Sequence, residues 1–219
     1  MPRPWTVIES VDTDEGPLEL RQRGDKDFLI TVGGRVLMSS SAHRSEYVLG
    51  EVPSKAVATR PAPNVVIGGL GLGYTLRGAL DALLPSAKVT VVELNPVVER
   101  WCRGPLAVLT KDALSDPRTS VVNDDIMRHL RSTPATYDAI ILDLYEGPNS
   151  RTHPTRDPFY SKSAIDTMKS ALRPKGVLAV WSEQADRPFE QRMSKAGFKT
   201  ELLRESRGGF HYAVYLGRL

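Results

Sequence analysis

The chain of 219 residues has little cysteine, histidine or aromatic content, and each shortage excludes a class of protein. Its single cysteine, Cys102, cannot form an internal disulfide, which excludes a disulfide-held scaffold and fits a reducing cytosol. The four histidines are scattered without the spacing of a metal site, so we expect no metal. No apolar run approaches the ~20 residues that a membrane-spanning helix needs.

Charge and the start of the chain exclude further classes. The net charge is only +3, and the basic residues are dispersed without interleaved aromatic side chains, which argues against a nucleic-acid partner. The stretch from Met1 to Trp5 shows no apolar region of the kind found in secretory signals. We therefore expect a cytoplasmic globular protein without a membrane partner. Its length fits one medium-sized domain, or one domain with a small appendage.

The beginning of the chain reads as β-rich. Alternating apolar residues flank Gly33-Gly34, a pair that favours a tight hairpin turn. The expected elements are strands at 18–22, 28–32 and 35–38, a short helix at 45–52 and a connector with three prolines at 53–63. Because so few strands bury little by themselves, we expect them to pack on the rest of the chain or on another subunit. We therefore divide the chain into an N-terminal β-hairpin segment, residues 1–52, and a main domain, residues 53–219.

From residue 65 strands and helices alternate. We expect strands at 65–67, 88–93, 119–123, 137–142, 176–181, 198–203 and 210–216, and helices at 74–84, 96–102, 126–131, 161–172 and 189–196. This succession indicates a parallel sheet with helices on both faces. No helix fits between the last two strands, so the final strand must enter antiparallel. The predicted fold class is α/β, with a doubly wound, mostly parallel seven-stranded sheet closed by an antiparallel C-terminal hairpin.

A glycine-rich turn and an acid form the most informative motif. The apolar run at 65–67 is followed by glycines, and Glu93 ends the next apolar run. A nucleotide-binding strand–turn–helix–strand unit has about this spacing, with the acid reaching a ribose. The alternative is a plain glycine turn in which Glu93 caps the next helix. The glycines together with an acid at the expected spacing favour nucleoside binding. We assign to this site Gly68, Gly69, Gly71, Gly73, Glu93 and Leu94.

Two further strand ends carry acids. Asp124 and Asp125 follow the third strand of the main domain, where a carboxylate could accept from an adenine amino group and the Ile126 amide could meet a ring nitrogen. One of the two acids could instead cap the following helix, and we expect Asp125 to contact the ligand. Asp143 follows the fourth strand, at the centre of the predicted cleft. A carboxylate there could orient or deprotonate an amine, or simply contact a cationic ligand.

The residues after Asp143 complete the predicted site. We assign Asp143, besides its catalytic role, together with Leu144 and Tyr145 to the nucleoside, although the tyrosine could merely cover the cleft. Glu146 and Tyr160 are the candidate contacts of the second substrate. The segment 147–158 is long, polar and rich in proline and arginine, so it is either a lid or a surface excursion.

The chain resembles the spermidine synthase (polyamine aminopropyltransferase) family and its methyltransferase-like, Rossmann-like fold. The resemblance rests on the glycine loop with the following Thr75-Leu76-Arg77, on Asp157-Pro158-Phe159-Tyr160 and on Leu172-Arg173-Pro174-Lys175-Gly176. It implies that Glu93 is the ribose acid, that Asp125 contacts adenine and that Asp143 activates the attacking amine. It also implies a co-substrate, either S-adenosylmethionine or its decarboxylated form, a small-molecule acceptor, a role in polyamine biosynthesis and a homodimer or larger homo-oligomer.

The chain departs from this family on the acceptor side. No acid occurs from Gly68 through Gly78, where the family carries an aspartate that holds the aminopropyl amine. Glu146 stands at best for a second catalytic-loop acid, and a tyrosine–histidine pair is replaced by Leu49-Gly50. The nucleoside half of the site is therefore retained and the polyamine half is eroded.

Three functions compete on these grounds. The first is a transferase that moves an aminopropyl or methyl group from an S-adenosyl donor to an acceptor, with an amine favoured and Asp143 as base. The second is a non-catalytic nucleoside-binding or scaffold protein on the same fold. The third is a nicotinamide dehydrogenase, which the C-terminal hairpin disfavours.

Overall fold

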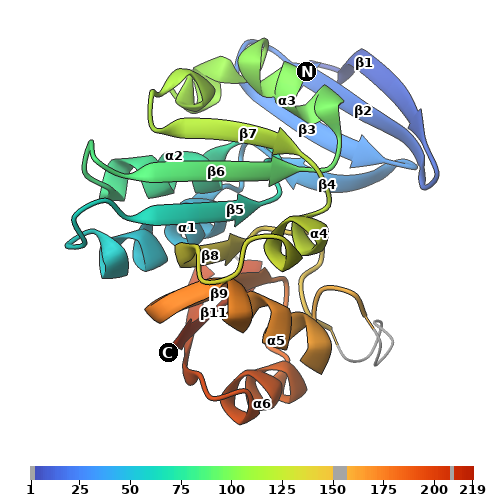
Figure 1. Cartoon of the computed structure of the whole chain (residues 1–219). Helices are drawn as coiled ribbons and strands as arrows, with labels where there is room; N and C mark the ends of the chain where they lie inside the picture. The colour runs from blue at the N-terminus through green and yellow to red at the C-terminus, as the bar shows by residue number, and fades with distance from the viewer. Residues whose placement is uncertain (1–2, 150–156, 208–209) are drawn as a thin grey trace.

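A computed structural model describes residues 3–149, 157–207 and 210–219, and it contains a large and a small sheet (Figure 1). The large sheet consists of β5 (Asn64–Gly68), β6 (Lys88–Glu93), β7 (Thr119–Asn123), β8 (Tyr137–Leu142), β9 (Leu172–Ser182), β10 (Lys199–Arg207) and β11 (Phe210–Arg218). Its seven strands lie in the order β10-β11-β9-β8-β5-β6-β7. Strand β11 pairs antiparallel with both neighbours, whereas the other pairs are parallel. The predicted fold class is therefore confirmed.

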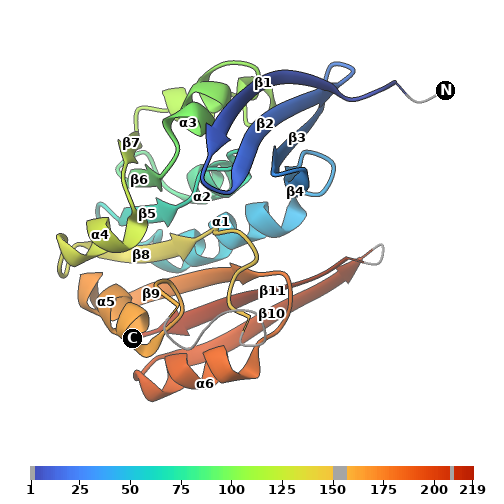
Figure 2. The same cartoon turned by 90° about the vertical axis from the view of Figure 1, so that its right-hand side faces the viewer.

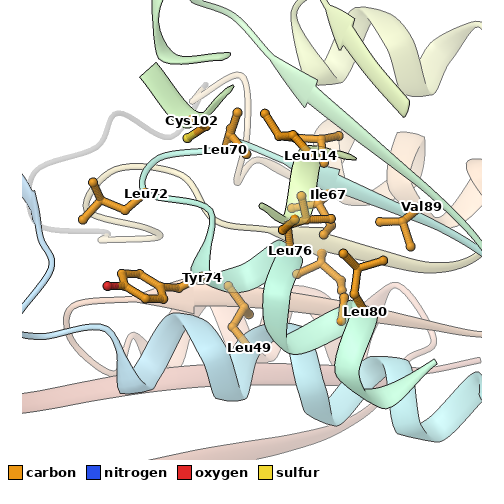
Figure 3. Packing of buried hydrophobic residues seen from close by; sticks show 14 of the residues in the cluster. Leu49, Ile67, Leu70, Leu72, Tyr74, Leu76, Leu80, Val89, Cys102 and Leu114 are labelled. Carbon is orange, nitrogen blue, oxygen red and sulfur yellow. The ribbon is translucent and has the colours of Figure 1, made fainter. Parts of the chain in front are cut away.

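Helices cover both faces of the large sheet. They are α1 (Arg44–Val57), α2 (Tyr74–Ala82), α3 (Pro96–Arg103), α4 (Ile126–Arg131), α5 (Lys162–Ala171) and α6 (Arg187–Lys195), with short 3₁₀ turns at Ala107–Leu109 and Ala113–Ser115. Alternate strand residues belong to different cores: Ile67 lies in the core of α1, α2 and α3, whereas Val66 lies in the core of α4, α5 and α6. This is the two-residue period of a strand buried on both faces. Figure 3 shows Leu76 and Leu80 of α2 lying among Leu49, Ile67 and Val89.

The small sheet packs on the main domain, as we expected for a segment that cannot bury much alone. It is formed by β1 (Thr6–Thr13), β2 (Gly16–Arg23), β3 (Asp27–Val32) and β4 (Arg35–Ser39), in that order. Figure 2 shows this sheet as a separate layer beside α2 and α3. The predicted hairpin at Gly33-Gly34 is confirmed, and both glycines have positive φ. Strand β1 was not predicted because its side chains stay mostly exposed.

Strand β1 is tied to α3 by polar contacts. The Trp101 indole N–H donates to Glu9 Oε2 at 2.7 Å, and Arg100 pairs with the other oxygen of the same carboxylate. The tryptophan hydrogen bond and the Arg100 pair lower the pKa of Glu9. Local contacts of this kind leave no periodic sequence signal, and they place the small sheet over the end of α3.

Helix α1 extends into residues 53–57, which we predicted to belong to the connector. It continues through Pro53 to Val57, five residues past the predicted end at residue 52. Proline lacks the N–H that would bond to the preceding turn. The helix tolerates it because Leu49, Pro53 and Val57 share one buried face. Since α1 spans residue 52, the division of the chain at that residue stays a prediction.

Helices α1 and α2 cross with their backbones in contact. A Cβ added at Gly50 would overlap the main-chain oxygen of Thr75, and one added at Gly78 would overlap that of Tyr47. Only glycine lets two helices approach so closely. The two glycines therefore form a reciprocal contact, which we call the α1–α2 crossing.

Asp138 joins three segments at the end of the large sheet opposite the carboxyl ends of β5 and β8. Its side chain is buried, pairs with Arg60 and Arg173, and accepts the Asn64 main-chain N–H at 2.7 Å. In Asp138→Asn the negative charge is lost and one acceptor oxygen becomes an NH2 donor, so the three donors are left with a single neutral acceptor. Because both arginines reach solvent, we expect Asp138→Asn to lower the free energy of unfolding by about 2 kcal/mol, measured by denaturant titration.

Asp166→Asn is the matched control for this change. The Asp166 side chain is 48% exposed and pairs with Lys162 one helical turn away, so its loss should cost less than about 0.5 kcal/mol. Equal losses in the two variants would show that the buried Asp138 network contributes nothing beyond an ordinary surface pair.

Candidate active site

A cleft of about 1310 Å³ lies between the small sheet and the carboxyl ends of the parallel strands. Ligands of open α/β sheets bind at such ends. One wall comes from the small sheet and is mainly apolar, with Leu18, Ile30, Val36, Leu37 and Met38. The other wall contains most of the predicted site residues: Gly69, Gly71, Glu93, Leu94, Asp124, Asp125, Ile126, Asp143, Leu144, Tyr145 and Tyr160.

Two of the predicted glycines do not line the cleft. Gly68 packs beneath α4, where a Cβ would lie 2.7 Å from Ile126 Cγ1. Gly73 caps the N-terminus of α2 with a φ of 83°, a conformation that favours glycine. We attribute their presence to packing and turn geometry, whereas Gly69 and Gly71 line the cleft, and their contact with a ligand stays a prediction.

Glu93 fixes the glycine loop from the neighbouring strand. Its Oε2 accepts the Leu70 N–H at 2.8 Å, and its Oε1 accepts the Asn95 N–H at 2.8 Å. Burial raises the pKa of Glu93, although these backbone bonds oppose the shift. Asn95 is the N-cap of α3 but makes no side-chain capping bond. Each carboxylate oxygen keeps capacity for a further donor, such as a ribose hydroxyl.

The two acids after β7 divide their roles differently from our expectation. Asp125, the predicted ligand contact, caps α4 by accepting the Arg128 N–H at 2.8 Å. Asp124 instead pairs with the Arg128 guanidinium, and this bond lowers the pKa of Asp124. The reason is geometric, since Asp125 is the last extended residue before the helix. Both acids line the cleft, so an adenine contact stays a prediction for each.

Asp143 lies on the floor of the cleft, directly after β8. The Thr75 hydroxyl donates to its Oδ2 at 2.6 Å. Burial raises the pKa of Asp143 to about 7, and the negative charge of Glu46 adds to that shift while the Thr75 bond opposes it. A group with this pKa is present in both protonation states near neutral pH, which is what a base or acid catalyst requires.

Sequence reasoning did not identify Glu46 or Thr75 as site residues. Glu46 lies in the first turn of α1 and is buried at the cleft, where burial raises its pKa. Thr75 is the second residue of α2. An acid in a first helical turn is ordinary, so no sequence signal marks Glu46. Only the packing of α1 on α2 brings both residues to Asp143.

Further carboxylates and aromatic rings line the same cleft as Asp143. They are Asp157, Glu183, Tyr145, Tyr160, Trp181 and Tyr212. Asp157 Oδ1 accepts the N–H groups of Phe159 and Tyr160 at 2.7 and 2.9 Å, which fixes this corner. Such surroundings suit an organic cation, because carboxylates supply charge and rings supply their π-faces.

Arg35 crosses the rim of the cleft from β4. It lies 3.5 Å from Glu15, 3.9 Å from Glu146 and 5.5 Å from the centre of the Tyr145 ring. Glu146, a predicted substrate contact, therefore faces Arg35 and does not line the cleft. Most of the predicted lid, residues 150–156 with His153, lies outside the described residues.

In residues 3–149, 157–207 and 210–219, no helix is both long and apolar enough to cross a membrane. Nor do three or more histidine, cysteine, aspartate or glutamate side chains in these residues gather as ligands for a metal ion.

Comparison with known proteins gives consistent matches. Residues 48–202 match the family model of the spermine/spermidine synthase domain. Polyamine aminopropyltransferase 1 of Streptomyces coelicolor is 33% identical over 168 residues, which cover 76% of this chain and 30% of that protein. Polyamine aminopropyltransferase of Sulfolobus acidocaldarius is 33% identical over 119 residues, or 52% of this chain and 37% of that protein. The chain therefore spans about a third of the length of these curated relatives.

Solved structures show the same fold. The crystal structure of spermidine synthase from Thermotoga maritima superposes with a TM-score of 0.78 at 20% identity, over 100% of this chain and 81% of that chain. A spermidine synthase in complex with the transition state analogue AdoDATO gives the same TM-score and identity over 100% of this chain and 80% of that chain. At this identity the likeness concerns the fold.

Proposed function

The chain belongs to the spermine/spermidine synthase family, and from this premise we propose that it transfers an alkyl group from an S-adenosyl donor to an amine. One observation carries the proposal: Asp143, with a pKa near neutral pH, lines the same cleft as the predicted nucleoside residues and a set of carboxylates and rings. The reaction needs a donor and an acceptor side by side, with a proton acceptor between them.

The chemistry is a displacement at a carbon next to a sulfonium. The amine nitrogen forms a bond to that carbon, the carbon–sulfur bond breaks, and the sulfur leaves as a neutral thioether. The proton released from the amine passes to an Asp143 carboxylate oxygen. The chain contributes the relative placement of the reactants and this base.

We favour the decarboxylated donor, and hence aminopropyl transfer to a polyamine-type acceptor. S-Adenosylmethionine carries a carboxylate that needs a cation. Arg77, the arginine nearest the glycine loop in sequence, does not line the cleft and donates to Asp81 at 2.6 Å, and Arg44, the arginine in the cleft lining, lies two residues before the acid Glu46 in the first turn of α1. An ammonium tail, in contrast, would meet the carboxylates of Glu46, Asp157 and Glu183. These carboxylates supply negative charge for the polyamine half of the site, which the sequence alone indicates is eroded.

The second candidate is a non-catalytic nucleoside-binding protein. The feature that favours it is the glycine loop, which carries no acid from Gly68 through Gly78 and has Met38 seated against Gly71 and a buried Leu72. A binder would keep its affinity for nucleosides without any need for Asp143.

A homodimer or larger homo-oligomer also remains our proposal. The supporting observation is that Val7, Ile8 and Val11 of the edge strand β1 are exposed. Apolar side chains on an unpaired sheet edge favour association with another chain.

Calorimetric binding tests the proposed function. The ligands are S-adenosylmethionine, its decarboxylated form and methylthioadenosine, with NAD as the control. We expect the decarboxylated donor and methylthioadenosine to bind, and S-adenosylmethionine to bind about tenfold more weakly, the equivalent of roughly 1.4 kcal/mol for its unpaired carboxylate. Preference for S-adenosylmethionine would replace aminopropyl transfer with methyl transfer. Binding of none of the three nucleosides would overturn the transferase proposal, and tight binding of NAD would restore the dehydrogenase.

A further inference from the structure

Thr75 connects α2, α1 and the loop after β8 beneath the floor of the cleft. Its side chain is buried, and its Oγ1 lies 2.6 Å from Asp143 Oδ2 and 3.0 Å from the main-chain oxygen of Glu46. Both neighbours accept hydrogen bonds when Asp143 is ionised, but a hydroxyl carries a single hydrogen. Thr75 can therefore donate to only one of them at a time.

The protonation state of Asp143 decides which neighbour receives that hydrogen. When Asp143 is ionised, the Thr75 hydroxyl donates to the carboxylate. When Asp143 is protonated, its own O–H donates to Thr75 Oγ1, and the threonine hydrogen turns to the Glu46 carbonyl oxygen. The bond pattern reverses by rotation of one hydroxyl, so the oxygen positions need not change.

We propose that Thr75 is a positioning residue that holds the Asp143 carboxyl group in one place in both of its protonation states. This inference rests on the proposed function, in which Asp143 accepts the amine proton as the nitrogen–carbon bond forms and the carbon–sulfur bond breaks. A base that turned away once protonated would have to be repositioned before the next cycle. Thr75 removes that need, because its hydroxyl pairs with the acid as well as with the carboxylate.

The charges around Asp143 support this arrangement. The carboxylates of Glu46 and Glu93 disfavour its ionised form, and Thr75 supplies the hydrogen bond that favours it. Burial raises the pKa of Glu46, and the charge of His43, at the N-terminal end of α1, opposes that shift. Burial also raises the pKa of Tyr160, and the negative charges of Asp157 and Asp143 add to that shift. Thr75 is therefore the group whose loss would raise the pKa of Asp143 further above its ordinary range.

The experiment compares Thr75→Val with Thr75→Ser. Valine keeps the shape of threonine without the hydroxyl, whereas serine keeps the hydroxyl. The primary readout is the titration of the Asp143 side-chain carbon by ¹³C NMR, assigned with Asp143→Asn, and it needs no substrate. We expect a midpoint about 0.5 to 1 pH unit higher in Thr75→Val, because Thr75 also bonds the protonated acid and only the extra strength of its bond to the charged form is lost, and an unchanged midpoint in Thr75→Ser.

Turnover gives the second readout. With the decarboxylated donor and a diamine, we expect Thr75→Val to lower kcat about 10- to 100-fold, to leave the donor KM within about twofold, and to move the acid limb of the pH profile upward. Thr75→Ser should restore all three quantities. Thr31→Val, a buried threonine of β3 that does not line the cleft, is the control for loss of a buried hydroxyl.

Each outcome decides the inference. A Thr75→Val midpoint equal to that of the wild type, or one that Thr75→Ser fails to restore, overturns it. If the midpoint moves only in the valine variant while the wild type shows no transfer, the positioning role stands and the proposed function fails. Thr75→Ala supplies the same comparison if the valine variant does not fold.

Discussion

Replacing Asp143 with asparagine is expected to reduce turnover by about 10²- to 10⁴-fold, the usual contribution of a general base. Asparagine keeps the size of the side chain and can still accept the Thr75 hydrogen bond, but it cannot take a proton from the amine. Affinity for methylthioadenosine should change by less than about threefold (roughly 0.65 kcal/mol), since the predicted ribose and adenine contacts lie elsewhere. Release of methylthioadenosine measures the rate.

The pH profile of the wild type gives an independent check on the same residue. Asp143 must be ionised to act as a base, and burial together with the Glu46 charge raises its pKa to about 7. The rate is therefore expected to fall as the pH drops through about 7 and to reach a plateau above that value. The residual activity of Asp143→Asn should lack this inflection.

Asp166→Asn, at a residue that does not line the cleft, serves as the control and should match the wild type. Full activity of Asp143→Asn would remove the base hypothesis. If no turnover were found in any variant while methylthioadenosine still bound, the non-catalytic nucleoside-binding alternative would be preferred.

Introducing a single methyl group at Gly50 is expected to have the largest effect on stability. The added Cβ would overlap the main-chain oxygen of Thr75 and lie 2.9 Å from the Ala79 nitrogen, so the two helices would have to separate. Overpacking of this kind costs about 3 kcal/mol when backbone atoms must move, although alanine is otherwise the better helix former. The expected fall in Tm is roughly 6–12 °C for a chain of this size.

Gly34→Ala is the control for the loss of a glycine as such. Gly34 has a φ of 80° and no atoms within contact distance of an added Cβ, so the cost there is backbone strain of about 1 kcal/mol. If Gly50→Ala stabilised the protein, as alanine does inside an ordinary helix, the α1–α2 crossing could not be as close as the structure has it. Thermal unfolding of the two variants and the wild type distinguishes these results.

The parts of the fold that the sequence predicts are those coded locally. The apolar run from Ala139 to Leu142 predicts a buried parallel strand, and the missing helix before β11 predicts the antiparallel hairpin. The glycines and Glu93 predict the nucleoside side of the site in the same way, because the motif is defined by the spacing of these residues within one strand–turn–helix–strand unit.

The parts that it does not predict depend on packing between distant segments. Thr75 and Asp143 are 68 residues apart, and Thr75 and Glu46 are 29 residues apart, so no local pattern relates them. The extension of α1 past Pro53 has a similar origin, since burial of one helix face outweighs the loss of a backbone bond. The roles of Asp124 and Asp125 required the exact start of α4, which is the least predictable property of a helix.

The α1–α2 crossing also bears on how fast a ligand enters and leaves. Two backbones in contact at Gly50 and Gly78 cannot slide without breaking the packing around them, so the helix pair that carries Glu46 in the cleft lining and Thr75 beneath the cleft is rigid. The opposite rim is held by Arg35, whose exposed ion pairs are individually weak. A ligand should therefore enter and leave the cleft beside Arg35. The residence time of a bound nucleoside should depend on that arginine more than on any residue of the rigid helix pair.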